Sequence, residues 1–422
     1  MDIKTDDLPK AITKNTRFLS TAQALSTVPT QINSLIGSLV VLRLTGSPAL
    51  SGLVISVTFV GRIVVPYFSG WAMDRKGRRV VLILGGVIIS VSYLGLALTE
   101  ISSQVATLFI FFLLYGVGNA IFSQVRIAMT DMYDASRAGK AIAYLYTSSI
   151  FGSLATIPLV ALIGLLSQPA GLDPYALLWL SGSLSMLPAL LAILLVRPDT
   201  SVIARVIGRS GRRTETGPSV RVELSRLTAP FAASSLSWGI MVAMMSLLSL
   251  DMAGDGFPLF LISTTITIHV AGMYLPSFPF GRITDRYGPK MLMVAGPLVT
   301  GVGGLLTPLT ANYYVITIGM FLVGVGWCGS TISSTSSIVS VIDASARGRV
   351  LGANDVTNNI ASMILPFAGG AVIGAYGFLG LGVFALALSL PASLVSFAMS
   401  PRKLPTSGKV QHRLGGVPGQ DD

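Results

Sequence analysis

The chain has 422 residues, of which 52% are hydrophobic and only 11% are charged. A soluble domain averages about 25% charged residues, so this composition argues against a large soluble protein. The formal net charge is +11, but the basic residues lie mostly between long apolar runs. We therefore interpret the positive charge as a sign of membrane topology and not of nucleic-acid binding.

Twelve runs are apolar enough and long enough to cross a bilayer as helices, for which about 20 residues are needed. The runs are Phe18–Leu42, Ser51–Ala72, Val80–Leu98, Val105–Thr130, Ala141–Leu166, Ala176–Val196, Ala229–Leu250, Leu259–Phe280, Met291–Leu309, Tyr313–Val339, Leu351–Ile373 and Phe378–Met399. They predict an all-α polytopic membrane protein with twelve transmembrane helices.

The polar segments predict the orientation in the membrane. With twelve spans both chain ends lie on one side, and the loops of that side carry most of the arginines and lysines. Because basic residues gather on the cytoplasmic side, we expect a protein of the cell (inner) membrane with both termini cytoplasmic. The expected divisions are a cytoplasmic segment 1–17, a six-helix half 18–196, a basic cytoplasmic linker 197–228, a second six-helix half 229–399 and a cytoplasmic tail 400–422.

Two charged decapeptides occur at matching places in the two halves. GWAMDRKGRR (Gly70–Arg79) follows the second span, and GRITDRYGPK (Gly281–Lys290) follows the eighth, 211 positions later. A second pair, SRAGKA (Ser136–Ala141) and ARGRVLG (Ala346–Gly352), recurs 210 positions apart. Two motifs with nearly the same offset indicate two six-helix repeats in parallel orientation.

Together these features resemble the major facilitator superfamily of secondary transporters, in its bacterial form, over Phe18–Met399. The first decapeptide matches the superfamily pattern G-x-x-x-D-R-x-G-R-R, whereas the second ends in Pro289–Lys290. The segment Arg126–Ala141 also resembles the superfamily loop between the fourth and fifth helices. The resemblance implies alternating access, in which two halves rock around a cavity that holds a small-molecule substrate.

The resemblance also implies a latch between the halves on the cytoplasmic side. Asp74 is expected to face the start of the eleventh helix, and Arg78 or Arg75 to pair with Asp131. Gly77 permits a sharp turn, Gly70 permits close helix approach, and arginine can fork onto a carboxylate. The plain alternative is a basic turn without a gating role. The expected gate residues are Gly70, Asp74, Arg75, Gly77, Arg78, Asp131, Arg137, Asp285, Arg286, Gly288 and Arg347.

Polar side chains inside spans are costly in a bilayer and mark functional sites. Arg62 lies near the middle of the second span and His269 near the middle of the eighth. Each also has a structural interpretation, Arg62 as a strut to backbone carbonyls and His269 as an interior hydrogen-bonding group. The resemblance adds side chains from spans one, four, seven and ten, which usually line the cavity. The expected cavity residues are Gln31, Arg62, Asn119, Trp238, His269 and Trp327.

His269 and Asp355 are the candidates for coupling to protons. Histidine has an intrinsic pKa of about 6.5, and Asp355 is the deepest carboxylate by position, although it lies close to the end of span eleven. Our default expectation is a neutral, hydrogen-bonding His269. The fifth span contains Gly152 and Pro158 but lacks the G-P-x-x-G-G ending of drug–proton antiporters, which weakens the case for drug–proton exchange.

The sequence predicts secondary transport of a small organic solute, leaning towards proton-linked efflux of amphipathic compounds. The alternatives are uptake of an anionic nutrient or metabolite, with Arg62 as a carboxylate clamp, and a non-transporting membrane sensor. We find no phosphate-binding glycine loop, zinc-ligand spacing or nucleophile elbow. We therefore expect no enzyme activity, cofactor, metal or nucleic-acid partner, and a monomer surrounded by membrane lipids.

The orientation can be tested by cysteine labelling, because Cys328 is the one native cysteine and lies inside the tenth span. A cysteine introduced at Ser210, in the basic linker, is expected to resist membrane-impermeant thiol reagents in intact cells. It should react once the cells are permeabilised. Ready labelling in intact cells would overturn the cytoplasmic assignment.

Overall fold

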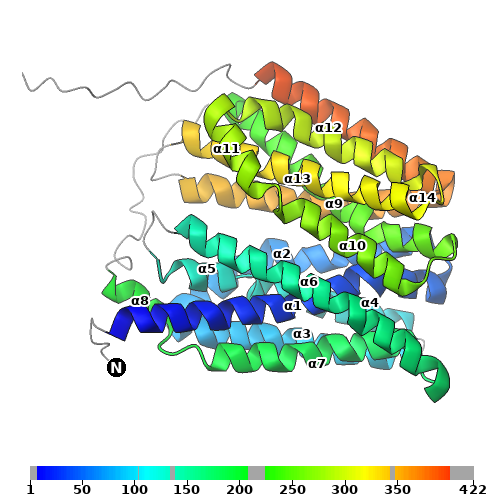
Figure 1. Ribbon diagram of the computed structural model, residues 1–422, viewed down its shortest axis with the longest axis horizontal. Helices are drawn as coiled ribbons and strands as arrows, with labels where there is room; N and C mark the ends of the chain where they lie inside the picture. The colour runs from blue at the N-terminus through cyan, green and yellow to red at the C-terminus, as the bar shows by residue number, and fades with distance from the viewer. Residues whose placement is uncertain (1–6, 103, 134–137, 208–223, 343–346, 400–422) are drawn as a thin grey trace, which may run out of the picture.

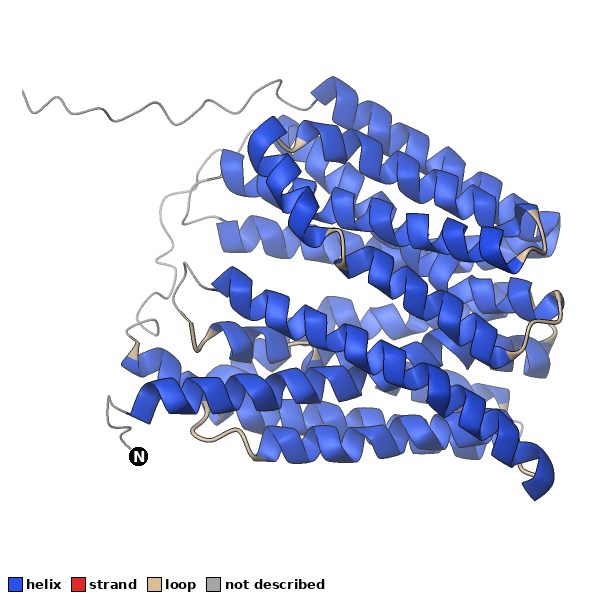
Figure 2. Cartoon of the chain, viewed as in Figure 1, coloured by secondary structure: helices blue, strands red, loops and turns tan. Residues whose placement is uncertain are grey.

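The computed structural model describes residues 7–102, 104–133, 138–207, 224–342 and 347–399, and every element in these ranges is a helix (Figure 2). The N-terminal half consists of α1 (Leu8–Thr45), α2 (Pro48–Lys76), α3 (Arg78–Ser102), α4 (Val105–Phe122), α5 (Val125–Thr130), α6 (Ala138–Ala170) and α7 (Pro174–Leu194), followed by the short α8 (Thr200–Val206). The C-terminal half consists of α9 (Leu224–Gly254), α10 (Leu259–Tyr274), α11 (Ser277–Tyr287), α12 (Lys290–Leu306), the 3₁₀ turn η3 (Thr307–Leu309), α13 (Tyr313–Val341) and α14 (Arg347–Met399).

The helix α14 is two transmembrane spans joined without a loop. A straight helix of its 53 residues would be about 80 Å long, far more than the ~30 Å core of a bilayer. At Gly377 φ is 71° and ψ is −173°, a conformation that glycine adopts readily, and the chain folds back there. With α14 divided, the eleven membrane-length segments of the described chain become twelve spans. This confirms the predicted fold class.

Some boundaries differ from the predicted ones. α1 begins at Leu8, so the polar residues before Phe18 extend the first span as helix, with Pro9 in the first turn where proline favours a helix start. α9 begins at Leu224, inside the segment predicted as linker. The eighth span is divided into α10 and α11 at Pro276, which has no N–H to continue the helical ladder.

The two halves lie side by side with their helices roughly along one direction (Figure 1). The start of α1 and the end of α14 lie at the same end of the molecule, at the left of the figure. We call this end the terminal face and the opposite end the far face. Because both chain ends share one face, every odd-numbered span runs from the terminal face to the far face.

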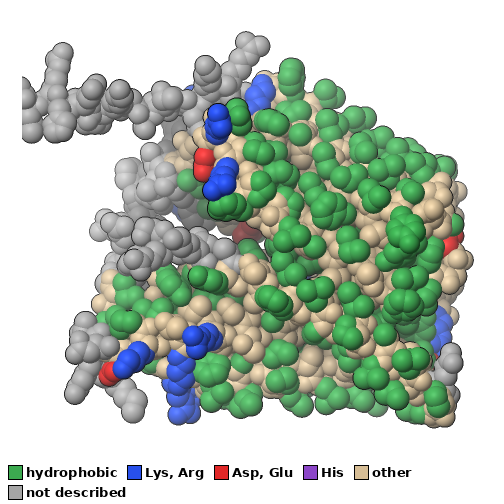
Figure 3. Space-filling model, viewed as in Figure 1, with side chains coloured by type: hydrophobic (Ala, Val, Ile, Leu, Met, Phe, Trp, Pro, Cys, Tyr) green, Lys and Arg blue, Asp and Glu red, His purple; other side chains and the backbone are tan. Residues whose placement is uncertain are grey.

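Large apolar side chains cover much of the outside of the bundle (Figure 3). Leu165 is 73% exposed, Tyr314 is 74% exposed and Ile101 is 72% exposed. Such an extended apolar surface is rare on a soluble monomer, where contiguous apolar patches are small. With most backbone groups of the described spans paired inside helices, this surface is suited to lipid. The protein is a multi-pass membrane protein.

The segment after α7 is fastened to the N-terminal half. Asn15 of α1 is fully buried; its side chain donates to the Pro198 carbonyl at 3.0 Å and accepts from the Arg197 N–H at 3.1 Å. Asp199 then accepts hydrogen bonds from the Arg78 and Arg79 N–H groups at 3.2 and 2.9 Å. The start of α3 is preceded by a glycine without a capping side chain, so Asp199 supplies the cap from elsewhere in the chain.

Asp199 also caps its own helix, α8, through the Ser201 N–H at 2.9 Å. Burial alone would raise the pKa of Asp199, but the hydrogen bonds from the N–H groups of Arg79, Ser201 and Arg78 outweigh it. They hold the pKa below its ordinary value of 3.8. A carboxylate with a depressed pKa stabilises the fold at pH values above its unfolded pKa, and this contribution is lost as the pH falls through the folded pKa.

We expect Asp199→Ala to lower the free energy of unfolding by about 0.5–2 kcal/mol for each helix cap lost. Thermal unfolding in detergent at pH 7 measures the loss. The wild-type chain should lose this contribution below about pH 4, whereas the variant should not. Thr13→Ala, a change at an exposed hydroxyl of α1, serves as the control. Equal unfolding temperatures for the Asp199 variant and the wild type would contradict the capping role.

Candidate functional site

A cavity of about 370 Å³ lies between the two halves. Its lining comes from α1, α2, α4, α5 and α6 on one side and from α9, α10 and α14 on the other. Gln31, Arg62, Asn119 and Trp238, four of the residues predicted from the sequence, line it. That they bind a substrate stays a prediction.

The halves pack tightly on the far side of this cavity. A Cβ atom on Gly52 of α2 would overlap the backbone carbonyl oxygen of Pro366 in α14, and Gly370 approaches α2 in the same way. The Ser38 hydroxyl of α1 donates to the Ser246 carbonyl of α9 at 2.6 Å. We call this set of contacts the far seam.

The cavity lies between the far seam and the terminal face. Along α1 the lining residues end at Ser34, before Ser38 of the seam, and along α14 they begin at Asp355, before Pro366 of the seam. At the terminal end, the side chains of Arg126 and Asp355 line the cavity and are 47% and 54% exposed. The cavity is therefore closed towards the far face and open towards the terminal face.

The two sides of the cavity differ in chemistry. α1 contributes hydroxyl and amide side chains, whereas α9 and α10 contribute almost only apolar and aromatic ones. The α1 wall is Gln23, Ser26, Thr27, Thr30, Gln31, Asn33 and Ser34, and the wall from α9 and α10 is Trp238, Met241, Val242, Met245, Ser246, Val270, Met273 and Tyr274. An amphipathic molecule can form hydrogen bonds on one side and pack against flexible methionines and aromatic rings on the other.

Arg62 is the deepest cation of the cavity. Its Nη2 donates to the Asn119 Oδ1 at 2.5 Å, and its guanidinium lies 4.7 Å from the ring centroid of Phe59. In the described part of the chain it makes no ion pair with an acid. Arg62 thus contacts a side-chain amide and a ring, where the structural interpretation expected backbone carbonyls. Most of its five N–H donors remain open to a ligand.

An aromatic cluster forms part of the apolar wall. Tyr146 of α6 stacks on Tyr274 of α10 with ring centroids 5.4 Å apart, so this pair bridges the halves. Trp327 of α13 contacts Trp238 with centroids 4.8 Å apart and Tyr274 at 6.2 Å. Trp327 is only 7% exposed and stands behind Trp238 and Tyr274. The expectation that Trp327 lines the cavity is therefore corrected.

His269 also lies behind the cavity wall. It is fully buried between α10 and α13, with its Nδ1 2.7 Å from the Met320 carbonyl oxygen. A carbonyl only accepts, so Nδ1 carries the proton in this arrangement. His269 is absent from the cavity lining, which corrects its expected place there. Burial against α13 suits a hydrogen-bonding role inside the half.

The first decapeptide forms ion pairs within the N-terminal half. Arg78 binds Asp74 at 2.7 Å and Asp131 at 2.9 Å, and Gly77 makes the turn with φ of 87°. The Asp74 side chain is 69% exposed and pairs with Arg78 of its own half. Its expected contact with the start of the eleventh helix falls on residues 343–348, whose side chains lie outside the description. Within the described ranges, the ion pair of Asp74 stays inside the N-terminal half.

The other residues predicted for the gate form no ion pair in the described chain. A Cβ atom on Gly70 would meet open space, so no close helix approach explains this glycine, and Arg75 lies over the Trp71 ring at 4.1 Å. Asp285 and Arg286 are exposed and form no ion pair in the described chain, and Gly288 turns with φ of 84°. Arg137 lies outside the described residues, and Arg347 is the first residue of α14, its side chain being outside the description.

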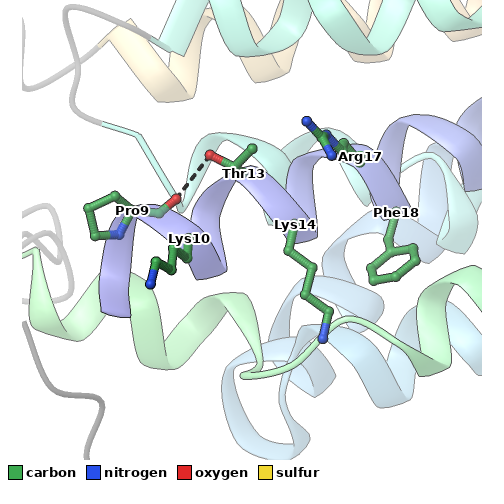
Figure 4. Close-up of a pocket in the computed structure, with 6 residues that line it drawn as sticks. All are labelled: Pro9, Lys10, Thr13, Lys14, Arg17 and Phe18. Carbon is green, nitrogen blue, oxygen red and sulfur yellow. Dashed lines mark hydrogen bonds between the residues drawn. The ribbon is translucent and has the colours of Figure 1, made fainter. Parts of the chain in front are cut away.

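A second, larger hollow does not lie between the halves. It lies on the outside of α1 near its start and is lined by that helix alone (Figure 4). Its residues are Pro9, Lys10, Thr13, Lys14, Arg17 and Phe18. A hollow on one helix face encloses nothing, so the cavity between the halves is the candidate site.

Comparison with known proteins places this arrangement in a family. The family model described as Major Facilitator Superfamily matches residues 19–273 and 231–415. The chain belongs to the major facilitator superfamily. Its members are membrane transporters and not enzymes.

Two individual relatives and one solved structure are similar to this chain over most of its length. The MFS-type transporter YdeG of Bacillus subtilis strain 168 is 26% identical over 408 residues, covering 94% of this chain and 93% of its own. The multidrug resistance protein MdtG of Enterobacter lignolyticus strain SCF1 is 25% identical over 344 residues, covering 80% of each chain. The xylose transporter XylE of E. coli, in a partially occluded inward-open conformation, superposes with a TM-score of 0.71 at 15% identity, covering 93% of this chain and 98% of its own.

Sequence reasoning missed several cavity residues. Met241 and Met245 follow Trp238 at helical spacing, i+3 and i+7, and this periodic face of α9 was the available signal. Arg126 was noted only as the start of a loop motif. Nothing in the sequence pairs Tyr146 with Tyr274, because the two residues come from different halves.

The ion pairs of Arg78 predict unequal effects of the two decapeptides. We expect Asp74→Asn to lower transport by several-fold with little loss of folded protein, because its side chain is largely exposed and so contributes little to stability. Asp285→Asn, at the matching place without an ion pair, should change transport less. Counterflow in proteoliposomes at equal protein content measures both. Unchanged transport in Asp74→Asn would remove the gating role of this decapeptide.

Proposed function

We propose that the protein exports small amphipathic organic solutes from the cytoplasm by alternating access and proton-linked exchange. The observation that carries the proposal is the cavity between the halves, with a hydrogen-bonding wall from α1 and an apolar, methionine-rich wall from α9 and α10. Methionine side chains adapt to ligands of different shape. One such cavity can therefore accept several related solutes.

The direction of transport is proposed from the orientation together with one relative. With both termini cytoplasmic, as the basic loops favour, the cavity of this structure opens to the cytoplasm and receives solutes there. The relative named multidrug resistance protein MdtG supports export. Because the basic loops favour a cytoplasmic side, we also propose that the protein lies in the inner membrane.

Asp355 is the proposed proton carrier. It is the carboxylate among the described cavity residues, whereas His269 is buried away from the cavity. A carboxylate that faces the cavity can exchange a proton with water on whichever side is open. His269, held by the Met320 carbonyl, is proposed to stabilise the packing of α10 on α13.

Uptake of an anionic nutrient is the second candidate function. A specific observation favours it, since Arg62 faces the cavity without an acidic partner in the described chain. In this arrangement Arg62 clamps the solute carboxylate, and the solute travels in the opposite direction. Export of a preloaded solute from inside-out and right-side-out proteoliposomes distinguishes the two directions.

The second candidate function uses Arg62, and its role can be tested by Arg62→Lys. Lysine keeps the charge but loses the planar fork of donors. We expect the affinity for a carboxylate solute to fall by about tenfold or more, equal to about 1.4 kcal/mol. Isothermal titration of the detergent-purified protein measures it, with Lys14→Arg on the outside of α1 as the control. Equal affinity in Arg62→Lys would show that Arg62 is a strut between α2 and α4.

A further inference from the structure

Three charged side chains line the cavity in the described part of the chain. Arg62 lies deep, whereas Arg126 and Asp355 lie near the terminal face. Among the described residues Arg62 has no acidic partner, while the Arg126 Nη2 lies 3.5 Å from the Asp355 Oδ2. The cavity therefore carries one positive charge in excess.

The pair of Arg126 and Asp355 is loose. Its one contact of 3.5 Å is longer than the 2.7–2.9 Å typical of charge-assisted hydrogen bonds, whereas Arg78 makes contacts of 2.7 and 2.9 Å. Both side chains are about half exposed, and solvent-exposed ion pairs are weak. Another anion can therefore replace Asp355 on Arg126.

The pair also connects the two halves. Arg126 belongs to α5 and Asp355 to α14. It stands where a solute enters from the terminal face. An entering anion meets Arg126 first and Arg62 further inside.

We propose that Asp355 is an internal counterion that a solute anion displaces from Arg126, and that the preferred solute is an amphipathic monoanion with an aromatic or apolar body. The body packs against Trp238, Met241 and Tyr274, while the anion lies between Arg126 and Arg62. This inference rests on the proposed transport function and narrows its solute class.

Charge balance gives the reason for a single negative charge. The empty cavity holds two arginines and one aspartate, so closing it at the terminal face would bury an unpaired charge, which is costly. A bound monoanion brings the cavity to two positive and two negative charges. A bound monoanion therefore favours closure relative to the empty cavity with an ionised Asp355, which couples solute charge to the movement of the halves.

Three probes of nearly one shape test the solute class. They are 2-naphthylacetate, the neutral 2-naphthylacetamide and the cationic 2-(2-naphthyl)ethylammonium, and their binding to the full-length purified protein is measured by isothermal titration. We expect the carboxylate to bind at least tenfold more tightly than the amide, and the cation to bind most weakly. No detectable binding of the carboxylate at millimolar concentration, or equal affinity for carboxylate and amide, would overturn the inference.

A double-mutant cycle tests the displacement itself. Asp355→Asn is expected to tighten carboxylate binding about fivefold, the upper range for an exposed ion pair, and to change amide binding less than twofold. Arg126→Gln should weaken carboxylate binding several-fold. In the Arg126→Gln background, Asp355→Asn should then bring no further gain, because the counterion has lost its partner.

Controls separate this mechanism from a general effect of charge and from misfolding. Asp7→Asn removes one exposed acid near the start of α1, outside the cavity, and should leave carboxylate binding unchanged. Size-exclusion profiles check that each variant is folded. If Asp355→Asn gives the same gain with and without Arg126, the counterion role is wrong.

Transport assays distinguish failure of this inference from failure of the proposed function. Counterflow of the three probes and of cationic amphipathic drugs is measured in proteoliposomes with the wild-type protein. Transport of the amide or of the cations without preference for the carboxylate would overturn the monoanion class and leave the transport function in place. Transport of none of these compounds would contradict the proposed function as well.

Discussion

Close packing of backbones at the far seam is the contact on which the rest of the structure depends. Gly52 brings α2 against Pro366 of α14 so closely that a single added methyl group would overlap the chain. The cavity lies between this seam and the terminal face, where it opens. There the pair of Arg126 and Asp355 connects the halves at 3.5 Å.

The cavity combines a cation on one side with an apolar wall on the other. Arg62 is a cation in the middle of a span, which is costly in a bilayer. In the described chain its contacts are the Asn119 amide and the Phe59 ring. Across the cavity, α9 and α10 present Trp238 and three methionines. A fixed cation opposite a deformable apolar wall selects solutes by charge at one end and tolerates variation at the other.

The amino-acid sequence was sufficient for the twelve spans and the repeated halves, because long apolar runs and a charged turn motif are local patterns. The family resemblance left Arg78 or Arg75 as the partner of Asp131, and the structure shows Arg78. It also located Arg62, since a charge at mid-span is visible without a structure. It misplaced His269 and Trp327, because helical rotation decides whether a side chain faces the cavity or the neighbouring α-helix. It could not reveal the Asp199 caps or the Tyr146–Tyr274 stack, which join segments distant in the chain.

Alternating access around the cavity is tested most directly by distances between spin labels in the reconstituted protein. One pair is attached at Lys76 and Tyr287 at the terminal face, and another at Leu172 and Tyr314 at the far face, all exposed positions. Double electron–electron resonance is recorded with and without 2-naphthylacetate. The account predicts that solute shifts the terminal pair to shorter distances and the far pair to longer ones. Terminal and far distances that stay unchanged, or that move in the same direction, would contradict it.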